Sequence, residues 1–298
     1  MQTHEMQSVT FLVPGTTANL GPGYDCLGIA LELFNRVTVT RQDKEPSPSG
    51  AGSVGHPGQS MAQEAGDLFF ARANQTRFSF EWNIQGDVPP SRGMGSSVTV
   101  RLGILSGLNA LTGSPLSPQG LFELCAQLEG HPDNAAPAAF GGFTVAGGNA
   151  VARFPVHEAL HFVLLIPDFE VSTPAARKVL PPQLERLSAV ASCANACRIT
   201  AAFASQNYSL LRGAFADGLH QPFREPLIPF LPRVIAGGEQ AGALGGFLSG
   251  SGSTICCVTV ENAEAVADAM LAAAGNATCR TLITRANNTG MRVSEARA

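Results

Sequence analysis

The nine residues from Pro89 to Ser97, PPSRGMGSS, lie between a predicted strand at 77–86 and a predicted helix at about 96–112. The helix is predicted from apolar residues that recur every three to four positions, namely Val98, Leu102, Leu105 and Leu108. Gly93 and Gly95 permit a close approach of the backbone to a ligand, and the helix start presents unpaired N–H groups and the positive end of its dipole. Such a loop binds an anion without needing a lysine.

Lysine is scarce in this chain, with two residues, Lys44 and Lys178, against seventeen arginines. A P-loop needs Gly-Lys-[Ser/Thr], and a protein kinase needs a strand lysine that reaches the phosphates. Neither lysine lies in such a context, so both architectures are excluded. Ser96 and Ser97 supply hydroxyls that can bond a phosphate or coordinate Mg²⁺ instead. Taken alone, GMGSS also fits a glycine-containing turn with a serine N-cap.

Strands alternate with helices along the chain, which indicates an α+β architecture. The length of 298 residues favours two domains, and we predict them at 1–155 and 156–298. Residues 42–66 are rich in Ser, Gly and Pro and predict a mobile surface excursion, followed by a helix at 67–74. Strands are also predicted at 8–13, 29–40 and in HFVLLIP, GGFLSGSGSTICCVTV and TLITRA. Further helices are predicted at 118–129, 174–180, 184–205, 207–219, 228–241 and 262–273.

The overall charge and the cysteines limit the possible partners and location. The net charge is −4 and the basic residues form no run, so we expect no nucleic-acid partner. No signal peptide and no window of about 20 apolar residues is visible, so we expect no membrane span. The seven cysteines are odd in number and lack CxxC spacing, which indicates reduced thiols in a cytoplasmic protein.

Several segments together resemble a known family. PPSRGMGSS is similar to the phosphate loop that forms the second motif of the GHMP kinases, with Met94 in place of leucine. VPGTTANLGPGYDCLGIAL (13–31) resembles their N-terminal motif as homoserine kinases have it, and FLSGSGSTIC (247–256) resembles the third motif. EGHPDNAAPAAFGG and DGLHQPFREPLIP extend the resemblance to nearly the whole chain outside 42–66.

The resemblance implies a two-domain GHMP kinase fold, with an N-terminal ribosomal-protein-S5-like domain and a C-terminal ferredoxin-like α/β sandwich. It implies transfer of phosphate from ATP to the hydroxyl of L-homoserine, with Mg²⁺ held by Ser97 and Glu129. Glu123, six residues earlier, is the alternative metal ligand. The nucleotide phosphates would lie on the loop formed by Pro89, Pro90, Ser91, Arg92, Gly93, Met94, Gly95, Ser96 and Ser97.

The resemblance also assigns the amino-acid end of the site. Asp25 can accept hydrogen bonds from an amine or a hydroxyl, and Arg177 and Arg224 resemble a pair that binds the carboxylate, because a guanidinium fork suits that group. Ser97 and Glu129, together with Asn19 and Asp25, form the expected catalytic set. The implied substrate-binding residues are Asn19, Asp25, His131, Asn134, Arg177, Arg224 and Gly250. Asp133 is a candidate for bracing the loop HPDN (131–134) that contains His131 and Asn134.

Two other functions remain open at this point. One is a GHMP kinase for another small alcohol such as mevalonate, and the other is a non-catalytic ligand sensor built on the same fold. Three segments depart from the family pattern. Ser253 stands for proline, the pair Thr16–Thr17 replaces a small-residue or serine pair, and Asp67 stands where an Asn-Leu pair usually precedes the adenine-contacting helix. A homodimer is expected from the resemblance alone.

Overall fold

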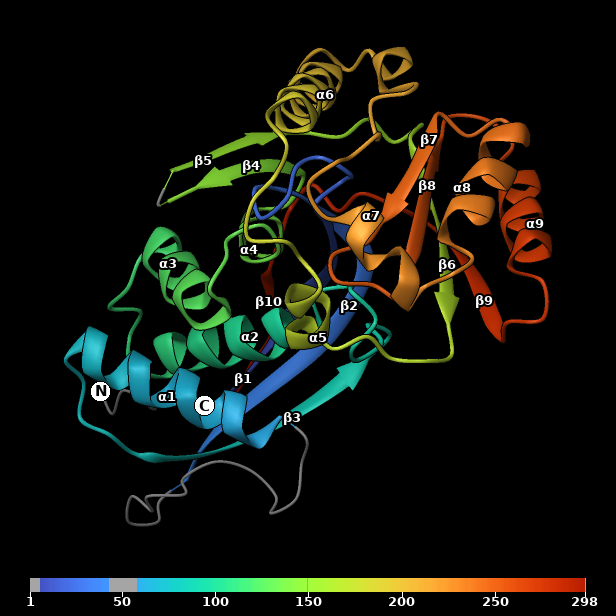
Figure 1. Ribbon diagram of the computed structural model, residues 1–298. Coiled ribbons are helices and arrows are strands. Elements are labelled where there is room, and N and C mark those ends of the chain that lie inside the picture. Colours follow the sequence, from blue (N-terminus) through green and yellow to red (C-terminus); the bar gives the residue numbers. More distant parts are fainter. Residues whose placement is uncertain (1–5, 43–57, 149, 298) are drawn as a thin grey trace.

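The computed structural model describes residues 6–42, 58–148 and 150–297 and contains two antiparallel sheets (Figure 1). The first sheet has the order β10-β1-β2-β4-β5, with β3 also paired to β2. Its strands are β1 (Ser8–Ala18), β2 (Leu27–Gln42), β3 (Ser79–Gly86), β4 (Phe143–Gly147), β5 (Ala150–Phe154) and β10 (Arg292–Arg297). The second sheet has the order β7-β8-β6-β9, formed by β6 (His161–Pro167), β7 (Gly245–Leu248), β8 (Ile255–Thr259) and β9 (Cys279–Arg285). This is the mixed helix-and-sheet, two-domain fold that the sequence predicts.

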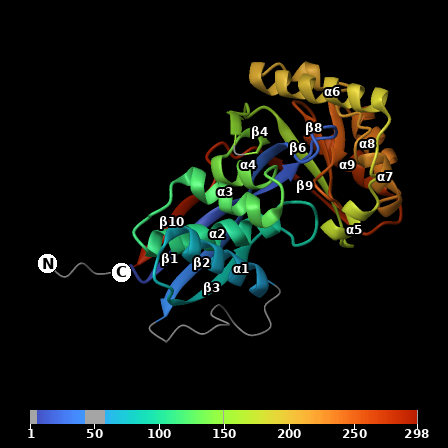
Figure 2. The same cartoon turned by 60° about the vertical axis from the view of Figure 1, so that its left-hand side comes forward.

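Helices cover both sheets, as Figures 1 and 2 show from two directions. The first sheet carries α1 (Gln59–Ala73), α2 (Ser96–Leu111), α3 (Pro118–Glu129) and α4 (Ala135–Phe140). The second half contains α5 (Thr173–Lys178), α6 (Arg186–Ser205), α7 (Gln221–Arg224), α8 (Leu231–Gln240) and α9 (Ala263–Ala274). Short 3-10 turns lie at Tyr208–Leu211 and Glu225–Leu227. Helices α8 and α9 pack on one face of the second sheet.

The two halves share one hydrophobic core, which fixes their relative position. Ile29 of β2 and Phe143 of β4 are fully buried together with Phe162 of β6 and Phe203 of α6. The rings of Phe143 and Phe203 stack with centroids 4.3 Å apart. Leu20 and Met94, which lie within the loops predicted to bind ligands, belong to the same core. The loops that face each other across the two halves are therefore held on a rigid support.

Helix α2 lies at the centre of the first half and confirms the helix predicted at 96–112. Most of its residues are buried, and it touches β1 and β2 on one side and α1 and α3 on the other. Gly103 and Gly107 allow this close packing, because a Cβ at either position would lie within 2.6 Å of the Val37 or Val39 side chain. The helix start, and with it the glycine loop, is thereby fixed against the sheet.

Four expectations need correction. Helix α1 begins at Gln59 and not near 67, so residues 59–66 are helical, while 43–57 lie outside the described residues. The helix predicted at 207–219 is only a 3-10 turn at Tyr208–Leu211 followed by turns. Strand β10 was not predicted, and it pairs with β1 of the first sheet. The end of the range 156–298 therefore belongs structurally with the first domain.

Helix α6 bears on the expectation that the chain contains no membrane span. Among the described residues it is the one helix long and apolar enough to cross a bilayer by length and composition. Only 22% of its most apolar window is buried. Its inner side packs into the core that the two sheets share, through Ile199, Ala202 and Phe203. The expected absence of a membrane partner stays a prediction.

Candidate active site

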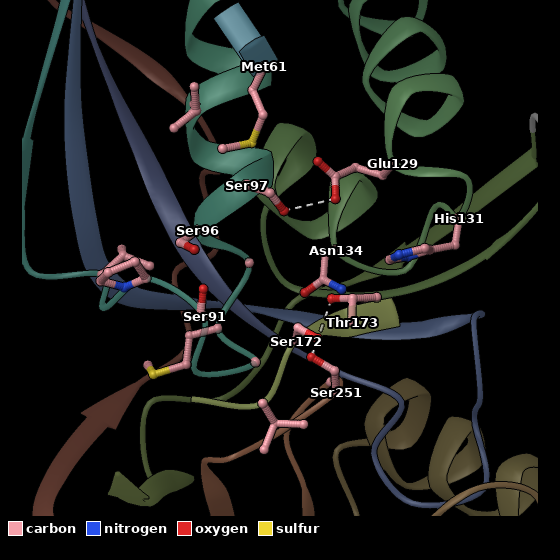
Figure 3. A pocket seen from close by; sticks show the side chains of 18 of the residues that line it. Met61, Ser91, Ser96, Ser97, Glu129, His131, Asn134, Ser172, Thr173 and Ser251 are labelled. Carbon is pink, nitrogen blue, oxygen red and sulfur yellow. Dashed lines mark hydrogen bonds between the residues drawn. The ribbon is translucent and has the colours of Figure 1, made fainter. Parts of the chain in front are cut away.

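One cavity of about 620 Å³ lies between the two halves, and both contribute to its wall. Figure 3 shows its lining from close by, with Ser96, Ser97 and Glu129 on one side and Ser172, Thr173 and Ser251 on the other. All seven residues predicted to bind the substrate line it: Asn19, Asp25, His131, Asn134, Arg177, Arg224 and Gly250. Of the predicted phosphate loop, the lining includes Pro90, Ser91, Gly93, Met94, Gly95, Ser96 and Ser97.

The glycine loop is shaped so that its backbone faces the cavity. Gly95 is the N-cap of α2 with φ of 68°, and the first helical turn leaves N–H groups without intrahelical acceptors. The carbonyl of Met94 accepts a hydrogen bond from the Thr16 N–H at 3.1 Å, which ties the loop to β1. The helix dipole and the free N–H groups favour an anion here.

The loop is also tied to the second half of the chain. The Ser249 hydroxyl donates to the Gly93 carbonyl at 2.7 Å, and the Thr254 N–H donates to the Arg92 carbonyl at 3.3 Å. The Thr17 and Ser249 hydroxyls are 2.8 Å apart. The phosphate loop (89–97) and the third motif (247–256) are therefore joined by hydrogen bonds. Thr17 and its neighbour Thr16 take part in this bonding.

Replacing Gly93 by alanine is expected to destabilise the protein and raise the KM for ATP. Gly93 has φ of 70°, and a Cβ there would lie 2.1 Å from the Ser249 carbonyl oxygen. Strain of this kind costs on the order of 1–3 kcal/mol. Thermal unfolding and ATP kinetics measure both effects. Gly147→Ala is the matched control, since a Cβ there meets nothing within 4 Å. An unchanged unfolding temperature and ATP KM for Gly93→Ala would contradict this account.

Ser97 and Glu129 meet inside the cavity and point toward one another (Figure 3). The Ser97 hydroxyl donates to Glu129 Oε2 at 2.9 Å, and Arg101 Nη1 donates to Glu129 Oε1 at 2.8 Å. Arg101 also donates to Glu64 of α1 at 3.0 Å. The Glu129 side chain is 7% exposed. A hydroxyl and a nearly buried carboxylate next to an anion-binding loop form a donor set that suits Mg²⁺.

Glu123, the alternative metal ligand, lies elsewhere. Its carboxylate accepts a hydrogen bond from Gln119 at 3.1 Å, and it lines a small surface hollow at the far end of α3. The structure therefore places Glu129 and not Glu123 beside Ser97.

His131, Asp133 and Asn134 form the floor of the amino-acid end. His131 Nδ1 is hydrogen-bonded to Asp133, whose carboxylate also accepts from the Asn134 N–H at 3.0 Å. Burial lowers the pKa of His131, but the hydrogen bond and charge of Asp133 outweigh it and raise the pKa above its ordinary value. Thr16 donates to the Asn134 side-chain oxygen at 2.6 Å. Asp133 thus braces the loop, and all three residues line the cavity.

Asp25 and Arg177 form an ion pair on the cavity wall. Arg177 Nη2 and Nη1 lie 2.8 and 3.1 Å from the two Asp25 oxygens, and Nη1 also donates to the Tyr24 hydroxyl at 2.8 Å. Asp25 has φ of 57°, and its N–H donates to the Asn19 side chain at 3.0 Å. The wall therefore presents a negative and a positive group side by side, both within reach of one small ligand.

Arg224 of α7 completes this end of the cavity. It is 2% exposed, and its Nε donates to the Ala176 carbonyl at 3.0 Å. Its Nη1 donates to the Gly250 carbonyl at 3.0 Å and lies 3.2 Å from His220 Nδ1. Burial lowers the pKa of Arg224, and so does the neighbouring Arg177 charge. Only Nη2 lacks a hydrogen-bond partner among the described residues, so Arg224 cannot offer the two-nitrogen fork that the sequence suggested.

Two residues of the predicted phosphate loop do not line the cavity. Arg92 donates to the carbonyls of Pro167 and Asp168 at 3.0 and 2.6 Å and pairs with Glu170 at 3.2 Å, so it braces the second half. Pro89 is also outside the lining. Asp67, expected near the adenine, instead pairs with Arg77 on the outside of α1. Arg92 differs from the expectation because neighbouring loop residues point in different directions, and Asp67 differs because it lies on the exposed face of α1.

The sequence analysis missed other lining residues. Met61 of α1, with Ile84, Val88 and Val100, makes the apolar part of the cavity next to the glycine loop. Thr173 lies one turn before Arg177 on α5, and its hydroxyl is 3.5 Å from that of Ser251 (Figure 3). The helical spacing of Thr173 and Arg177 could have revealed this residue. Met61 could not be found, because its segment was read as a surface excursion.

Comparison with known proteins agrees with this geometry. The family model for the N-terminal domain of GHMP kinases matches residues 60–142, and the model for their C-terminal domain matches 199–277. Together with the fold, these matches define the class as a two-domain GHMP kinase. The homoserine kinase of Synechococcus sp. is 39% identical over 279 residues, which cover 88% of this chain and 90% of that protein. The chain belongs to the homoserine kinase family of the GHMP kinases.

Solved structures show the same relation. The crystal structure of homoserine kinase from Cytophaga hutchinsonii superposes with a TM-score of 0.88 at 25% identity, and 99% of each chain is covered. Methanococcus jannaschii mevalonate kinase superposes with a TM-score of 0.68 at 14% identity, covering 95% of this chain and 99% of that one. The second likeness concerns the fold alone.

Proposed function

We propose that this protein transfers the γ-phosphoryl group of ATP to the hydroxyl of L-homoserine and forms O-phospho-L-homoserine, a step of threonine biosynthesis. The observation that carries the proposal is the charge layout of a single cavity. One end has the glycine loop, Ser97 and Glu129, and the other has Asp25 next to Arg177 and Arg224. A small amino-acid alcohol fits between an anion-binding loop and a pair of opposite charges.

The two charged groups at the amino-acid end match a zwitterion. Asp25 would accept hydrogen bonds from the ammonium group, while Arg177 and Nη2 of Arg224 would donate to the carboxylate. A zwitterion can take over both partners of the Asp25–Arg177 pair without leaving either charge alone. Mevalonate carries a carboxylate but no ammonium group, so it would leave Asp25 without a new partner. This argument favours homoserine within the GHMP kinases.

The chemistry asks mainly for positioning and for stabilisation of charge. Ser97 and Glu129 would hold Mg²⁺, which supplies positive charge to the phosphates when bound. The N–H groups at the start of α2 would bind phosphate oxygens, and Asn19, His131 and Asn134 would orient the homoserine hydroxyl. His131 is itself held by Asp133 and therefore has a fixed ring orientation. This assignment requires no strong catalytic base.

A non-catalytic sensor is the second candidate function. A sensor has no need for Ser97, Glu129 and Arg101 to be joined at the phosphate end, yet all three are hydrogen-bonded here. This observation favours the enzyme.

An ADP-release assay with four alcohols tests the proposal. We expect turnover with L-homoserine, and a fall in kcat/KM of about ten- to a hundredfold for analogues that lack either the carboxylate or the ammonium group. A charged hydrogen-bond partner contributes about 1.5–3 kcal/mol, which corresponds to that range. The analogues are 3-amino-1-propanol and 4-hydroxybutyrate, and mevalonate is the fourth compound. Preference for mevalonate would refute the substrate assignment, and no ADP release with any compound would support a sensor.

We further propose a cytoplasmic location, a domain boundary near residue 155 and a homodimer. We place the protein in the cytoplasm, because all seven cysteines are free thiols and five of them are at least partly covered. The domain boundary near residue 155 agrees with the passage from β5 to β6, apart from the return of β10. The homodimer stays a prediction, which sedimentation at several protein concentrations would test.

A further inference from the structure

His220 is a buried histidine directly behind the amino-acid end of the cavity. It precedes α7, it is fully buried, and it does not line the cavity itself. Its Nε2 lies 2.8 Å from the Gly21 carbonyl oxygen and 3.3 Å from Asp217 Oδ2. Its Nδ1 lies 3.2 Å from Nη1 of Arg224. The ring of Tyr24 lies alongside, with centroids 5.3 Å apart.

These contacts define the tautomer of the ring. A guanidinium group has only donors, so Nδ1 must accept the hydrogen bond from Arg224 and carries no proton. The proton is then on Nε2, where it points to the Gly21 carbonyl. The Asp217 carboxylate is already engaged, because it accepts the N–H groups of Leu219, His220 and Gln221 at 2.6 to 3.1 Å.

A charged imidazolium would not fit this position. It would direct an N–H group at the guanidinium, and two cations would face each other without solvent. Burial is the largest influence on the pKa of His220 and lowers it, Asp217 opposes that effect, and the Arg224 charge lowers the pKa further. The net direction is below the ordinary value. Tyr24 and Asp25 are the other titratable groups near the ring.

The orientation of Arg224 depends on three acceptors. Nε is fixed by Ala176, and Nη1 is fixed by Gly250 on one hydrogen and by His220 on the other. With these satisfied, Nη2 is the nitrogen left for a ligand. Two of the acceptors are backbone carbonyls, and His220 is the side-chain acceptor, so its identity decides whether Nη1 is fully satisfied.

We propose that His220 is a positioning residue that, as the neutral Nε2–H tautomer, accepts a hydrogen bond from Arg224 and thereby directs Nη2 of Arg224 at the substrate carboxylate. The inference rests on the proposed function, because Arg224 is taken to bind that carboxylate. A purely structural role is the competing explanation, since Nε2 also ties the loop containing Asn19 and Asp25 through Gly21. The two ring nitrogens allow these roles to be separated.

Two substitutions at His220 test the contact of Nδ1 with Arg224 and the contact of Nε2 with Gly21 separately. In His220→Asn the amide oxygen can take the place of Nδ1 and keep the acceptor for Arg224, while the contact to Gly21 is lost. In His220→Gln the amide nitrogen can take the place of Nε2 and keep the contact to Gly21, while the acceptor for Arg224 is lost. Both variants lose the ring next to Tyr24, so they are matched in that respect.

We expect His220→Gln to raise the homoserine KM by about tenfold, the usual effect of losing one hydrogen-bond partner of a charged group. The kcat and the ATP KM should change by less than about twofold, and His220→Asn should restore most of the homoserine affinity. For 3-amino-1-propanol, which has no carboxylate, the two variants should have equal KM values. Equal homoserine KM values for the two variants, or a larger loss in His220→Asn, would overturn the proposal.

A measurement on the unaltered protein is independent of variants and of turnover. The ¹⁵N chemical shifts of the His220 ring should show an unprotonated Nδ1 and a protonated Nε2 at pH 7. A protonated Nδ1 would overturn the proposal even if homoserine is the substrate. Conversely, if the protein does not phosphorylate homoserine, the proposed function fails, while the ring nitrogens still report whether His220 accepts from Arg224. The two failures are therefore distinguishable.

Discussion

Replacing Glu129 by glutamine should lower kcat by about ten- to a hundredfold or somewhat more, with little effect on folding. Losing a charge-assisted contact in a desolvated site costs about 1.5–3 kcal/mol, and each 1.4 kcal/mol corresponds to a tenfold change in rate. Glutamine preserves the volume and can still accept from Ser97. Arg101 keeps its second partner, Glu64, so no buried cation is left alone. Turnover at saturating ATP and Mg²⁺, together with thermal unfolding, measures the two effects separately.

Two further variants sharpen this test. Ser97→Ala should lower kcat over a similar range, because it removes the hydroxyl that meets Glu129 at 2.9 Å. Glu123→Gln on the same helix is the matched control, since its carboxylate bonds Gln119 outside the cavity, and it should retain normal turnover. Near-normal turnover of Glu129→Gln at saturating Mg²⁺ would remove Glu129 from the site.

Replacing Arg224 by alanine should raise the homoserine KM by about ten- to a hundredfold and leave the ATP KM nearly unchanged. The range follows from about 1.5–3 kcal/mol for a charged hydrogen-bond partner. Arg224 lies at the amino-acid end, whereas the glycine loop lies at the other end of the cavity. Because Arg224 also donates to the carbonyls of Ala176 and Gly250, the alanine variant should lose stability as well. Affinity and unfolding temperature should therefore be measured on the same preparation.

Arg224→Lys should recover only part of the lost affinity. A lysine ammonium keeps the charge, but it cannot satisfy Ala176, Gly250 and a ligand from three separate nitrogens. Arg280→Ala on the exposed side of β9 controls for the loss of one positive charge. In the alanine variant, 3-amino-1-propanol should suffer little further loss. Equal weakening of ATP and homoserine would instead assign Arg224 to the phosphate end.

The parts of the fold that the sequence predicted well have strong local signals. Helix α3, predicted at 118–129, has a strong local start signal, because the hydroxyl of Ser117 accepts from the Gly120 N–H as an N-cap and a proline follows at the first helical position. Helix α1 was placed too late because the residues it buries first are small, namely Ala62, Ala65 and Gly66. Small residues give a weak hydrophobic pattern, and the packing that favours this helix comes from α2.

Strand β10 was missed for a different reason. Its residues, Arg292–Arg297, are almost all exposed, so no alternation of apolar and polar residues marks the strand. It exists because β1 offers it a pairing edge nearly 300 residues earlier in the chain. Non-local pairing of this kind leaves little trace in the local sequence.

For the functional residues, too, local sequence motifs were informative, whereas features that depend on distant segments were not. Motifs indicated the loops that would meet, and the predicted substrate residues do line one cavity. The direction of each side chain within a loop could not be read from a motif, as Arg92 shows. The fixed bonding of Arg224 was also beyond reach, because Ala176, His220 and Gly250 come from three separate segments.

The pairing of the last strand with the first has a consequence for synthesis on the ribosome. Residues Ser8–Leu12 pair with β10, and the Gln7 N–H donates to the Arg297 carbonyl at 2.9 Å. A nascent chain can form the rest of the first sheet early, yet this edge stays open until residues 292–297 have left the exit tunnel. An open strand edge is a site for pairing with other chains. Prematurely terminated products should therefore be recognisable to quality-control proteases by an unpaired edge of β1, although nearly all of the ligand-binding segments have already been made.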